Sequence, residues 1–240
     1  GSYNMLKSML PRFGITTTFV DPNDVSNFDA AVQENTRLIF AESLGNPKLD
    51  VLDLRAISEV AKKYKIPFMV DNTVATPALL KPIEHGVNIV IHSLTKYING
   101  NGTSMGGVII DAGTFDWSSG KFPEFTSPSP SYHGLNYHEA LGPAAYIARI
   151  RVEGLRDLGG AISPFNAFQI IQGIETLEVR MEKHSQNALE LAQWLSENEA
   201  VEWVNYPGLA SSKYKALADE YLPNGQSGVV TFGAKGGFEA

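Results

Sequence analysis

Four short runs of mostly apolar residues are typical of buried strands. They are Leu38-Ile39-Phe40-Ala41, Phe68-Met69-Val70, Asn88-Ile89-Val90-Ile91 and Val108-Ile109-Ile110. Because none of them alternates polar and apolar positions, we expect a sheet that is covered on both faces. After the first run, Asp53 is placed to cap a helix whose apolar positions recur at Leu54, Ile57, Val60, Ala61 and Tyr64. Strands that alternate with helices predict an α/β fold with a mostly parallel sheet flanked by helices.

The chain changes character after Asp111. Residues 115–137 are rich in Ser, Pro, Gly and aromatic side chains without a dominant period, which predicts an ordered but irregular loop. A loop of this length inside a domain is usually functional or a family insertion. Helical spacing returns from Pro164 onward and predicts long helices. We expect a large domain over residues 1–180 and the beginning of a smaller C-terminal domain over residues 181–240.

Composition and charge narrow the classes of function. The 240 residues carry a formal net charge of -7, and 43% of them are hydrophobic, which is ordinary for a soluble globular protein. Scattered basic residues disfavour a nucleic-acid partner, and the apolar stretches are too short to span a membrane. The absence of cysteine excludes disulfides and thiolate nucleophiles, and the five histidines lack the spacing of metal ligands. Residues 1–11 lack the apolar core of a secretory signal, so we expect a cytoplasmic location.

The stretch Ser93-Leu94-Thr95-Lys96 is the main candidate for chemistry. It follows the third strand directly and precedes the glycine-rich residues 100–107. Lysine is usually a solvated surface residue. However, the hydroxyls of Ser93 and Thr95 suit an anionic phosphate, and glycines let the backbone approach a ligand. The pattern therefore predicts a ligand site at Lys96, whose amine would lose its proton more readily if partly desolvated.

Two further polar groups follow strands of the same sheet. Asp71 comes directly after the second strand, and Asn46 lies in the turn after the first strand. Each has a purely structural explanation, as a helix cap for Asp71 and as a turn residue for Asn46. The carboxyl ends of parallel strands meet at one edge of a sheet, where α/β folds bind ligands. We therefore expect Asp71, Asn46, Ser93 and Lys96 to cluster there.

At these residues the chain resembles the Cys/Met-metabolism family of fold-type I enzymes that depend on pyridoxal 5'-phosphate (PLP). The resemblance covers nearly the whole chain and rests on Asp-Asn-Thr at 71–73 and Ser-x-Thr-Lys at 93–96. It implies that Asp71 pairs with the pyridine nitrogen and keeps the ring an electron sink. It also implies that Ser93 and Thr95 contact the phosphate and that Lys96 holds the cofactor as a Schiff base. Asn46 is implied to lie near the phenolic oxygen of the ring.

Within the family, several segments are most similar to the O-acetylhomoserine sulfhydrylases. They are Gly1 to Asn4, Pro11 to Ile15, Ser131 to Gly134 and Gly173 to Leu177. The loop at residues 115–137 favours this branch, because the γ-lyases of the family resemble the chain without such an insertion. Tyr132 and His133 in this loop are candidates to face the substrate, although we expect the aromatic loop to pack against its own domain.

The resemblance implies a PLP-dependent transferase of methionine biosynthesis by trans-sulfuration. Its reaction would be a γ-replacement on O-acetyl-L-homoserine. Lys96 would take the proton from Cα, a second proton would leave Cβ, acetate would leave from Cγ, and sulfide would add to give L-homocysteine. A thiol in place of sulfide would give the S-substituted product. A homo-oligomer, either a dimer or a homotetramer, is implied for the complete protein.

Other functions stay open on the sequence alone. A methionine γ-lyase or a cystathionine γ-synthase-type enzyme of the same family would differ in nucleophile or leaving group. The family carries a phosphate-binding glycine loop ahead of what is Gly1 here and a substrate-binding arginine beyond Ala240. The chain therefore resembles a fragment, and a catalytically incomplete fragment is the alternative outside the enzymes. A nicotinamide-dependent oxidoreductase is disfavoured, because no Gly-x-Gly-x-x-Gly follows the first strand.

Overall fold

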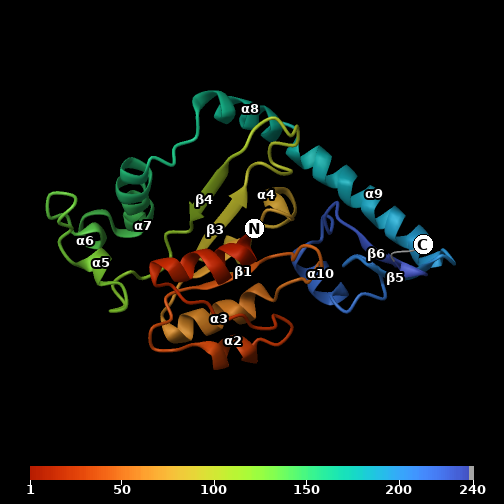
Figure 1. Ribbon diagram of the computed structural model, residues 1–240, viewed down its shortest axis with the longest axis horizontal. Helices are drawn as coiled ribbons and strands as arrows, with labels where there is room; N and C mark the ends of the chain where they lie inside the picture. The colour runs from red at the N-terminus through yellow and green to blue at the C-terminus, as the bar shows by residue number, and fades with distance from the viewer. Residues whose placement is uncertain (238–240) are drawn as a thin grey trace. The chain divides into compact units, whose positions relative to one another are not determined.

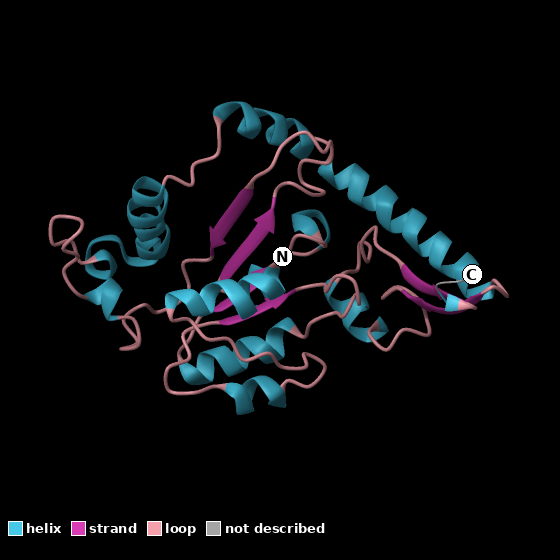
Figure 2. Ribbon diagram, viewed as in Figure 1, coloured by secondary structure: helices cyan, strands magenta, loops and turns pink. Residues whose placement is uncertain are grey.

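The structure is a computed structural model that describes residues 1–237 (Figures 1 and 2). The chain divides into two compact units, residues 1–36 and the residues from Arg37 onward. None of the helices in the described part is long and apolar enough to cross a membrane.

The first unit is helical. Its elements are α1 (Ser2–Asn4), η1 (Met5–Met9), η2 (Leu10–Phe13) and α2 (Ser26–Ala31). The first three run on from one another as one helical segment that changes its winding, and Gly14 ends it with a left-handed φ of 77°. A glycine adopts this conformation without the steric cost that a Cβ atom brings.

The second unit is built on a four-stranded sheet in the order β1-β2-β3-β4 (Figure 2). The strands are β1 (Ile39–Glu42), β2 (Phe68–Asp71), β3 (Ile89–Ser93) and β4 (Gly107–Asp111). The first three are parallel, and β4 is antiparallel to β3. All four expected strands form, and the prediction of an α/β fold with a mostly parallel sheet is confirmed.

Helix α3 (Leu54–Tyr64) connects β1 to β2 as a crossover helix. Its start is capped as predicted, because Asp53 Oδ1 accepts a hydrogen bond from the backbone N–H of Ala56 at 3.1 Å. Its buried positions include Leu54, Ile57, Val60 and Ala61, which are the apolar positions of the helical pattern. The periodicity of this segment therefore predicted both the helix and its buried face.

The expectation that every strand is covered on both faces is wrong for β4. Gly107 is exposed and the Ile109 side chain is 41% exposed, whereas Phe68, Val70 and Ile89 are buried. β4 pairs only with β3 among the described strands, so it is an edge strand. A run of three apolar residues is too short to distinguish an edge strand from a central one.

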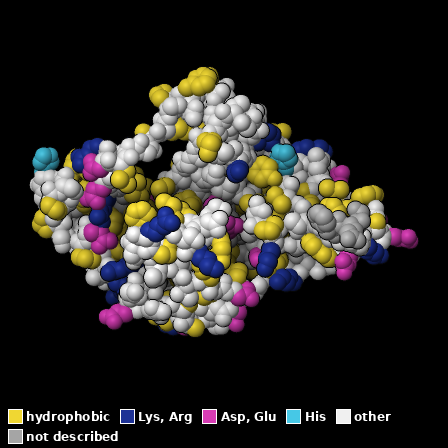
Figure 3. All heavy atoms as spheres, viewed as in Figure 1, with side chains coloured by type: hydrophobic (Ala, Val, Ile, Leu, Met, Phe, Trp, Pro, Cys, Tyr) yellow, Lys and Arg dark blue, Asp and Glu magenta, His cyan; other side chains and the backbone are white. Residues whose placement is uncertain are grey.

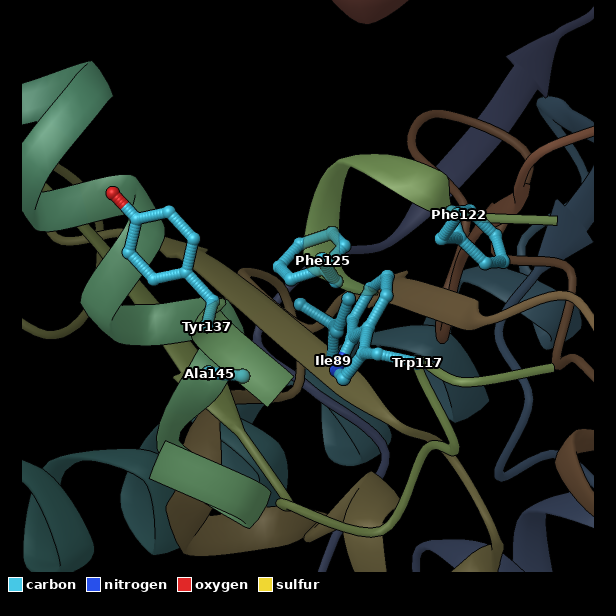
Figure 4. Packing of buried hydrophobic residues seen from close by; sticks show 6 residues of the cluster. All are labelled: Ile89, Trp117, Phe122, Phe125, Tyr137 and Ala145. Atoms are coloured by element: carbon cyan, nitrogen blue, oxygen red, sulfur yellow. The ribbon is translucent and has the colours of Figure 1, made fainter. Parts of the chain in front are cut away.

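The segment between β2 and β3 and the segment between β4 and residue 164 contain only short helices. They are α4 (Thr76–Leu79), η3 (Pro82–His85), α5 (Pro123–Thr126), α6 (Tyr137–Leu141), η4 (Gly142–Ala144), α7 (Ala145–Arg149) and η5 (Ile150–Arg156). Residues 115–137 are irregular apart from the single turn of α5, which confirms the expected loop. An aromatic cluster that includes buried Trp117, Phe122 and Phe125 fixes this loop against the sheet. Trp117 and Phe125 lie beside Ile89 of β3, and Phe122 packs against Trp117 (Figure 4). Tyr132 packs against the same cluster, as expected for a loop that covers its own domain.

The last third of the described chain begins with two consecutive helices, α8 (Pro164–Ile174) and α9 (Leu177–Glu197). After them come β5 (Val201–Asn205), α10 (Lys215–Tyr221) and β6 (Thr231–Ala234), and the two strands form a separate antiparallel pair. α9 contacts both α4 and β5. The expected domain boundary near Met181 falls inside α9, which runs through it without a break, and that boundary stays a prediction.

Candidate active site

The carboxyl ends of β1, β2 and β3 meet at one edge of the sheet, and the candidate residues follow them. Glu42 of β1 is the register neighbour of Asp71, and Asp71 is the register neighbour of Ile91 in β3. Ser93 ends β3. Because the three strands are parallel, polar groups that are far apart in sequence come together at this edge.

Asp71 is joined to the end of β3 through Thr73. Its Oδ1 accepts hydrogen bonds from the backbone N–H of Thr73 at 2.9 Å and from Thr73 Oγ1 at 2.5 Å. Thr73 Oγ1 in turn accepts the backbone N–H of Ser93 at 2.8 Å. Within residues 1–237, Asp71 Oδ2 accepts no hydrogen bond, so this oxygen keeps its lone pairs for another donor. The threonine was not recognised from the sequence, although it is the last residue of the Asp-Asn-Thr motif.

Asn72 is fully buried and links the carboxyl ends of β1, β2 and β3 through hydrogen bonds. Its backbone N–H donates to the carbonyl of Ile91 at 2.9 Å, and its Oδ1 accepts a hydrogen bond from Ser43 Oγ at 2.7 Å. Its Nδ2 donates to the carbonyls of Thr76 at 3.2 Å and Leu80 at 2.8 Å. A buried amide with all of these partners fixes the backbone on both sides of Asp71.

Replacing Asn72 by alanine is expected to lower the free energy of unfolding by about 3 kcal/mol, because it leaves buried carbonyl and hydroxyl groups without partners. Denaturant titration measures the change. Asn101→Ala, at an exposed position, is the matched control and should change stability by less than about 0.5 kcal/mol. Equal stability of the two variants would contradict the assigned role of Asn72.

The turn that carries Lys96 is held by its neighbours. The backbone N–H of Leu94 donates to the carbonyl of Gly106 at 2.9 Å, and that of Asn99 donates to the carbonyl of Leu94 at 2.9 Å. Thr95 Oγ1 donates to the Gly106 carbonyl at 3.3 Å and accepts the Gly106 N–H at 3.2 Å. The Lys96 side chain is exposed, which differs from the partly desolvated lysine expected from the sequence.

Asn46 lies in a turn whose bonds run back to β1. Its backbone N–H donates to Glu42 Oε2 at 3.2 Å, and its side chain is exposed. The turn is closed by the N–H of Gly45, which donates to the carbonyl of Asp50 at 3.0 Å. The side chain of Asn46 is therefore presented from the loop at the same edge as Asp71.

Glu42 is a site residue that the sequence reasoning did not single out. Burial raises its pKa, the hydrogen bond from the Asn46 N–H opposes that rise, and the neighbouring Asp71 carboxylate adds to it. Its position could have drawn attention, since it directly follows an apolar strand in the way that Asp71 does.

His92 lies on β3 beside these residues and is 5% exposed. Burial lowers its pKa, and the charge of Asp71 opposes that effect. Within the described residues its Nδ1 has no hydrogen-bond partner. The neutral imidazole is therefore the favoured form in the folded protein.

The pKa of His92 is lower in the folded protein than in the unfolded chain, where it is about 6.5. The unfolded chain therefore binds a proton more readily as the pH falls below about 6.5, and this lowers the free energy of unfolding until the pH passes the folded-state pKa. We expect the free energy of unfolding to fall between pH 7 and pH 5, and His92→Gln to fall less steeply. Urea titrations across this range measure the slope. His133→Gln, at an exposed loop position, is the control and should keep the native slope. A His92→Gln slope equal to the native one would contradict this account.

The backbone after Lys96 packs directly against the junction of α8 and α9. Arg180 Nη1 donates to the carbonyl of Tyr97 at 2.7 Å, and its Nη2 donates to the carbonyl of Gly173 at 2.6 Å. A Cβ atom at Gly173 would lie 2.0 Å from the carbonyl oxygen of Asn99, so only glycine permits this approach. Arg180 and Gly173 therefore set the position of the lysine turn, and sequence periodicity alone gave no sign of either contact.

The whole chain matches a known protein family. Residues 1–240 match the family model described as Cys/Met metabolism PLP-dependent enzyme. The chain is 52% identical to the O-acetyl-L-homoserine sulfhydrylase of Leptospira meyeri and 49% identical to the homocysteine synthase of Schizosaccharomyces pombe. These alignments cover 100% and 99% of this chain. The chain spans 56% of the length of each of these two relatives.

Solved structures give the same result. A protein of Campylobacter jejuni described as an O-acetylhomoserine (thiol)-lyase, which contains N'-pyridoxyl-lysine-5'-monophosphate, matches 98% of this chain and 59% of its own, with a TM-score of 0.94 and 41% identity. The O-acetylhomoserine sulfhydrylase of Wolinella succinogenes matches 98% of this chain and 63% of its own, with a TM-score of 0.86 and 38% identity. On the family match over its whole length, supported by these relatives, the chain belongs to the Cys/Met metabolism family of PLP-dependent enzymes.

Proposed function

We propose that this chain supplies the lysine and the ring-binding carboxylate of a PLP-dependent γ-replacement enzyme. The reaction would convert O-acetyl-L-homoserine and sulfide into L-homocysteine and acetate, and with a thiol in place of sulfide it would give the S-substituted homocysteine and acetate. The observation that carries the proposal is the hydrogen-bonded link from Asp71 through Thr73 to Ser93, three residues before Lys96. The names of the relatives support the choice of substrate, since they are O-acetylhomoserine sulfhydrylases and homocysteine synthases.

The described residues fit PLP in their chemistry. Asp71 Oδ2 is available to accept a hydrogen bond from a protonated pyridine nitrogen, and a charge-assisted bond of this kind is stronger than a neutral one. Ser93 brings a hydroxyl to the same strand end, and Thr95 brings another within the lysine turn. Lys96 brings an exposed primary amine. The hydroxyl of Ser93 would hold the phosphate, together with groups from the rest of the longer protein. The hydroxyl of Thr95 would donate to the phosphate in place of its 3.3 Å hydrogen bond to the Gly106 carbonyl.

Bound PLP would supply an electron sink for charge that develops at Cα of the substrate. Lys96 would hold the cofactor covalently between turnovers and would accept the Cα proton when its amine is free. Asp71 would keep the ring nitrogen protonated. Asn46 would donate from its side-chain amide toward the phenolic oxygen of the ring.

Glu42 would act as a positioning residue in this account. It accepts the backbone N–H of Asn46 at 3.2 Å and thereby holds the turn that presents the Asn46 side chain. Burial raises the pKa of Glu42, and the neighbouring Asp71 adds to that rise.

The complete protein is proposed to work as a homo-oligomer, either a dimer or a tetramer. α8 supports this, because Phe165, Phe168 and Ile171 are 65%, 58% and 53% exposed. Figure 3 shows hydrophobic side chains on the surface at the top of the view, where α8 lies. Apolar side chains gathered on one helix are typical of a surface that another chain or segment covers. A cytoplasmic location and the absence of a nucleic-acid partner stay predictions.

A chimera tests the proposed function, because the chain spans only part of its relatives. The matching segment of the Leptospira meyeri sulfhydrylase is replaced by this chain, and homocysteine formation from O-acetyl-L-homoserine and sulfide is measured. We expect turnover by the chimera and little or none by the isolated 240-residue chain. A folded chimera that binds PLP but releases only elimination products would instead indicate a lyase.

A further inference from the structure

A cavity of about 390 Å³ lies at the other edge of the sheet from Asp71. Leu38 and Pro67, which precede β1 and β2, line it together with Ile89 at the start of β3. None of the residues of the candidate active site lines it. Its volume is within the range of small-molecule sites, which are concave, mostly apolar and carry a few polar groups.

Part of the cavity lining consists of aromatic side chains that belong to the buried aromatic cluster. Trp117, Phe122 and Phe125 line it, yet they are only 4–5% exposed. The ring of Trp117 stacks on that of Tyr146 with a centroid distance of 4.9 Å and an interplanar angle of 4°. Figure 4 shows Trp117 and Phe125 close beside Ile89 of β3. Rings packed in this way form a rigid apolar wall that needs no rearrangement to accept a flat or branched apolar group.

Two guanidinium groups and two carboxylates line the cavity, and both carboxylates pair with the same guanidinium, that of Arg149. Arg149 Nε donates to Glu153 Oε2 at 2.8 Å, and Arg149 Nη1 lies 4.0 Å from Glu124 Oε1. The guanidinium of Arg37 lies 5.7 Å from the centroid of the Phe122 ring and makes no ion pair with any residue from 1 to 237. Arg37 therefore presents an unpaired positive charge beside an aromatic, largely apolar space.

We propose that this cavity binds a small apolar carboxylate, such as an aryl-substituted or branched aliphatic acid. The apolar body would pack against Trp117 and Phe125. The carboxylate would form a bidentate ion pair with the guanidinium of Arg37. A neutral apolar molecule would leave Arg37 unpaired, and a cation would be repelled by it. The combination of aromatic wall and free guanidinium selects the anion.

An occupied cavity would stabilise the irregular loop at residues 115–137, because Trp117, Phe122 and Phe125 all belong to that loop. A ligand that binds only the folded state raises its stability by mass action. The floor of the cavity includes Met69 and Ile89 on β2 and β3, the strands whose other ends lead to Asp71 and Ser93. Binding here is independent of the cofactor, so its test does not depend on the proposed function.

Titration calorimetry on the chain with phenylacetate, 2-phenylethanol and phenethylamine tests the proposal. These probes share one ring and differ in charge. We expect saturable binding of phenylacetate, at least about tenfold weaker binding of 2-phenylethanol, and no binding of phenethylamine up to about 10 mM, because a charged hydrogen bond contributes about a tenfold preference or more. Quenching of tryptophan fluorescence gives a second readout, since Trp117 borders the cavity.

Two variants locate the site. Arg37→Ala changes an exposed residue and should bind phenylacetate no better than 2-phenylethanol, whereas Arg151→Ala, exposed on η5 and absent from the lining, should keep the preference. Gly154→Leu should weaken all binding, because Gly154 lines the cavity and a Cβ there would meet only Ile150 Cγ2 at 3.7 Å.

Three results would overturn the proposal. They are the absence of saturable phenylacetate binding, an equal or tighter affinity for the alcohol or the amine, and an unchanged phenylacetate preference in Arg37→Ala. The last result would place any observed binding elsewhere on the molecule, since Arg37 is the charge that the proposal requires.

Discussion

Lys96→Ala in the chimeric protein is expected to lower homocysteine formation by at least about a thousandfold, while the fold is kept. The loss is large because the same amine holds the cofactor and moves the Cα proton, and general base catalysis alone contributes about 10²- to 10⁴-fold. The side chain is exposed, so its removal opens no cavity in the core. Steady-state assays and circular dichroism measure the two effects.

Lys183→Ala is the matched control for Lys96→Ala. Lys183 is exposed on α9 and, among residues 1–237, pairs with Gln186 at 2.9 Å, so its loss should leave turnover within about twofold, as expected for a surface change. Full activity of Lys96→Ala would show that another lysine carries the cofactor.

Asp71→Asn is expected to lower kcat by about a hundredfold. The amide can still accept the bonds from Thr73, so the local backbone should persist. It cannot hold a proton on the ring nitrogen as a carboxylate does, and the loss of a charge-assisted hydrogen bond of about 1.5–3 kcal/mol corresponds to roughly 10- to 150-fold. Weaker retention of PLP should accompany the loss, measured by the visible absorbance of the purified protein.

The exposed carboxylate of Asp157 offers a control for the change of charge. Asp157→Asn removes an ion pair with Arg156 on the surface, where such pairs contribute little, and should leave kcat unchanged. An Asp71→Asn variant that turns over as fast as Asp157→Asn would remove Asp71 from the chemistry.

The fold was largely predictable because the apolar pattern that specifies each strand and helix lies within a short segment of the sequence. The apolar run at residues 68–70 became β2, and the 3.6-residue spacing with its Asp53 cap became α3. The exposure of β4 was not predictable, since three apolar residues look alike on an edge strand and on a central one. The sheet edge shared by Asp71 and Ser93 followed from parallel topology alone.

The rest of the site depends on contacts that sequence spacing does not encode. Thr73 links Asp71 to Ser93, and Arg180 reaches the backbone of Tyr97 from α9, 83 residues away. Glu42 acquires its raised pKa only through burial beside Asp71. Each of these properties arises from tertiary packing. The motif residues, in contrast, could be predicted from their residue types and from their positions at the ends of strands.

The attachment point of the cofactor tests the central claim most directly. The chimera is loaded with PLP, reduced with borohydride and digested, and the modified peptide is identified by mass spectrometry. The account predicts a pyridoxyl group on Lys96, in the peptide that contains Ser93 to Lys96. A pyridoxyl group on any other lysine of this chain, with Lys96 unmodified, would contradict it.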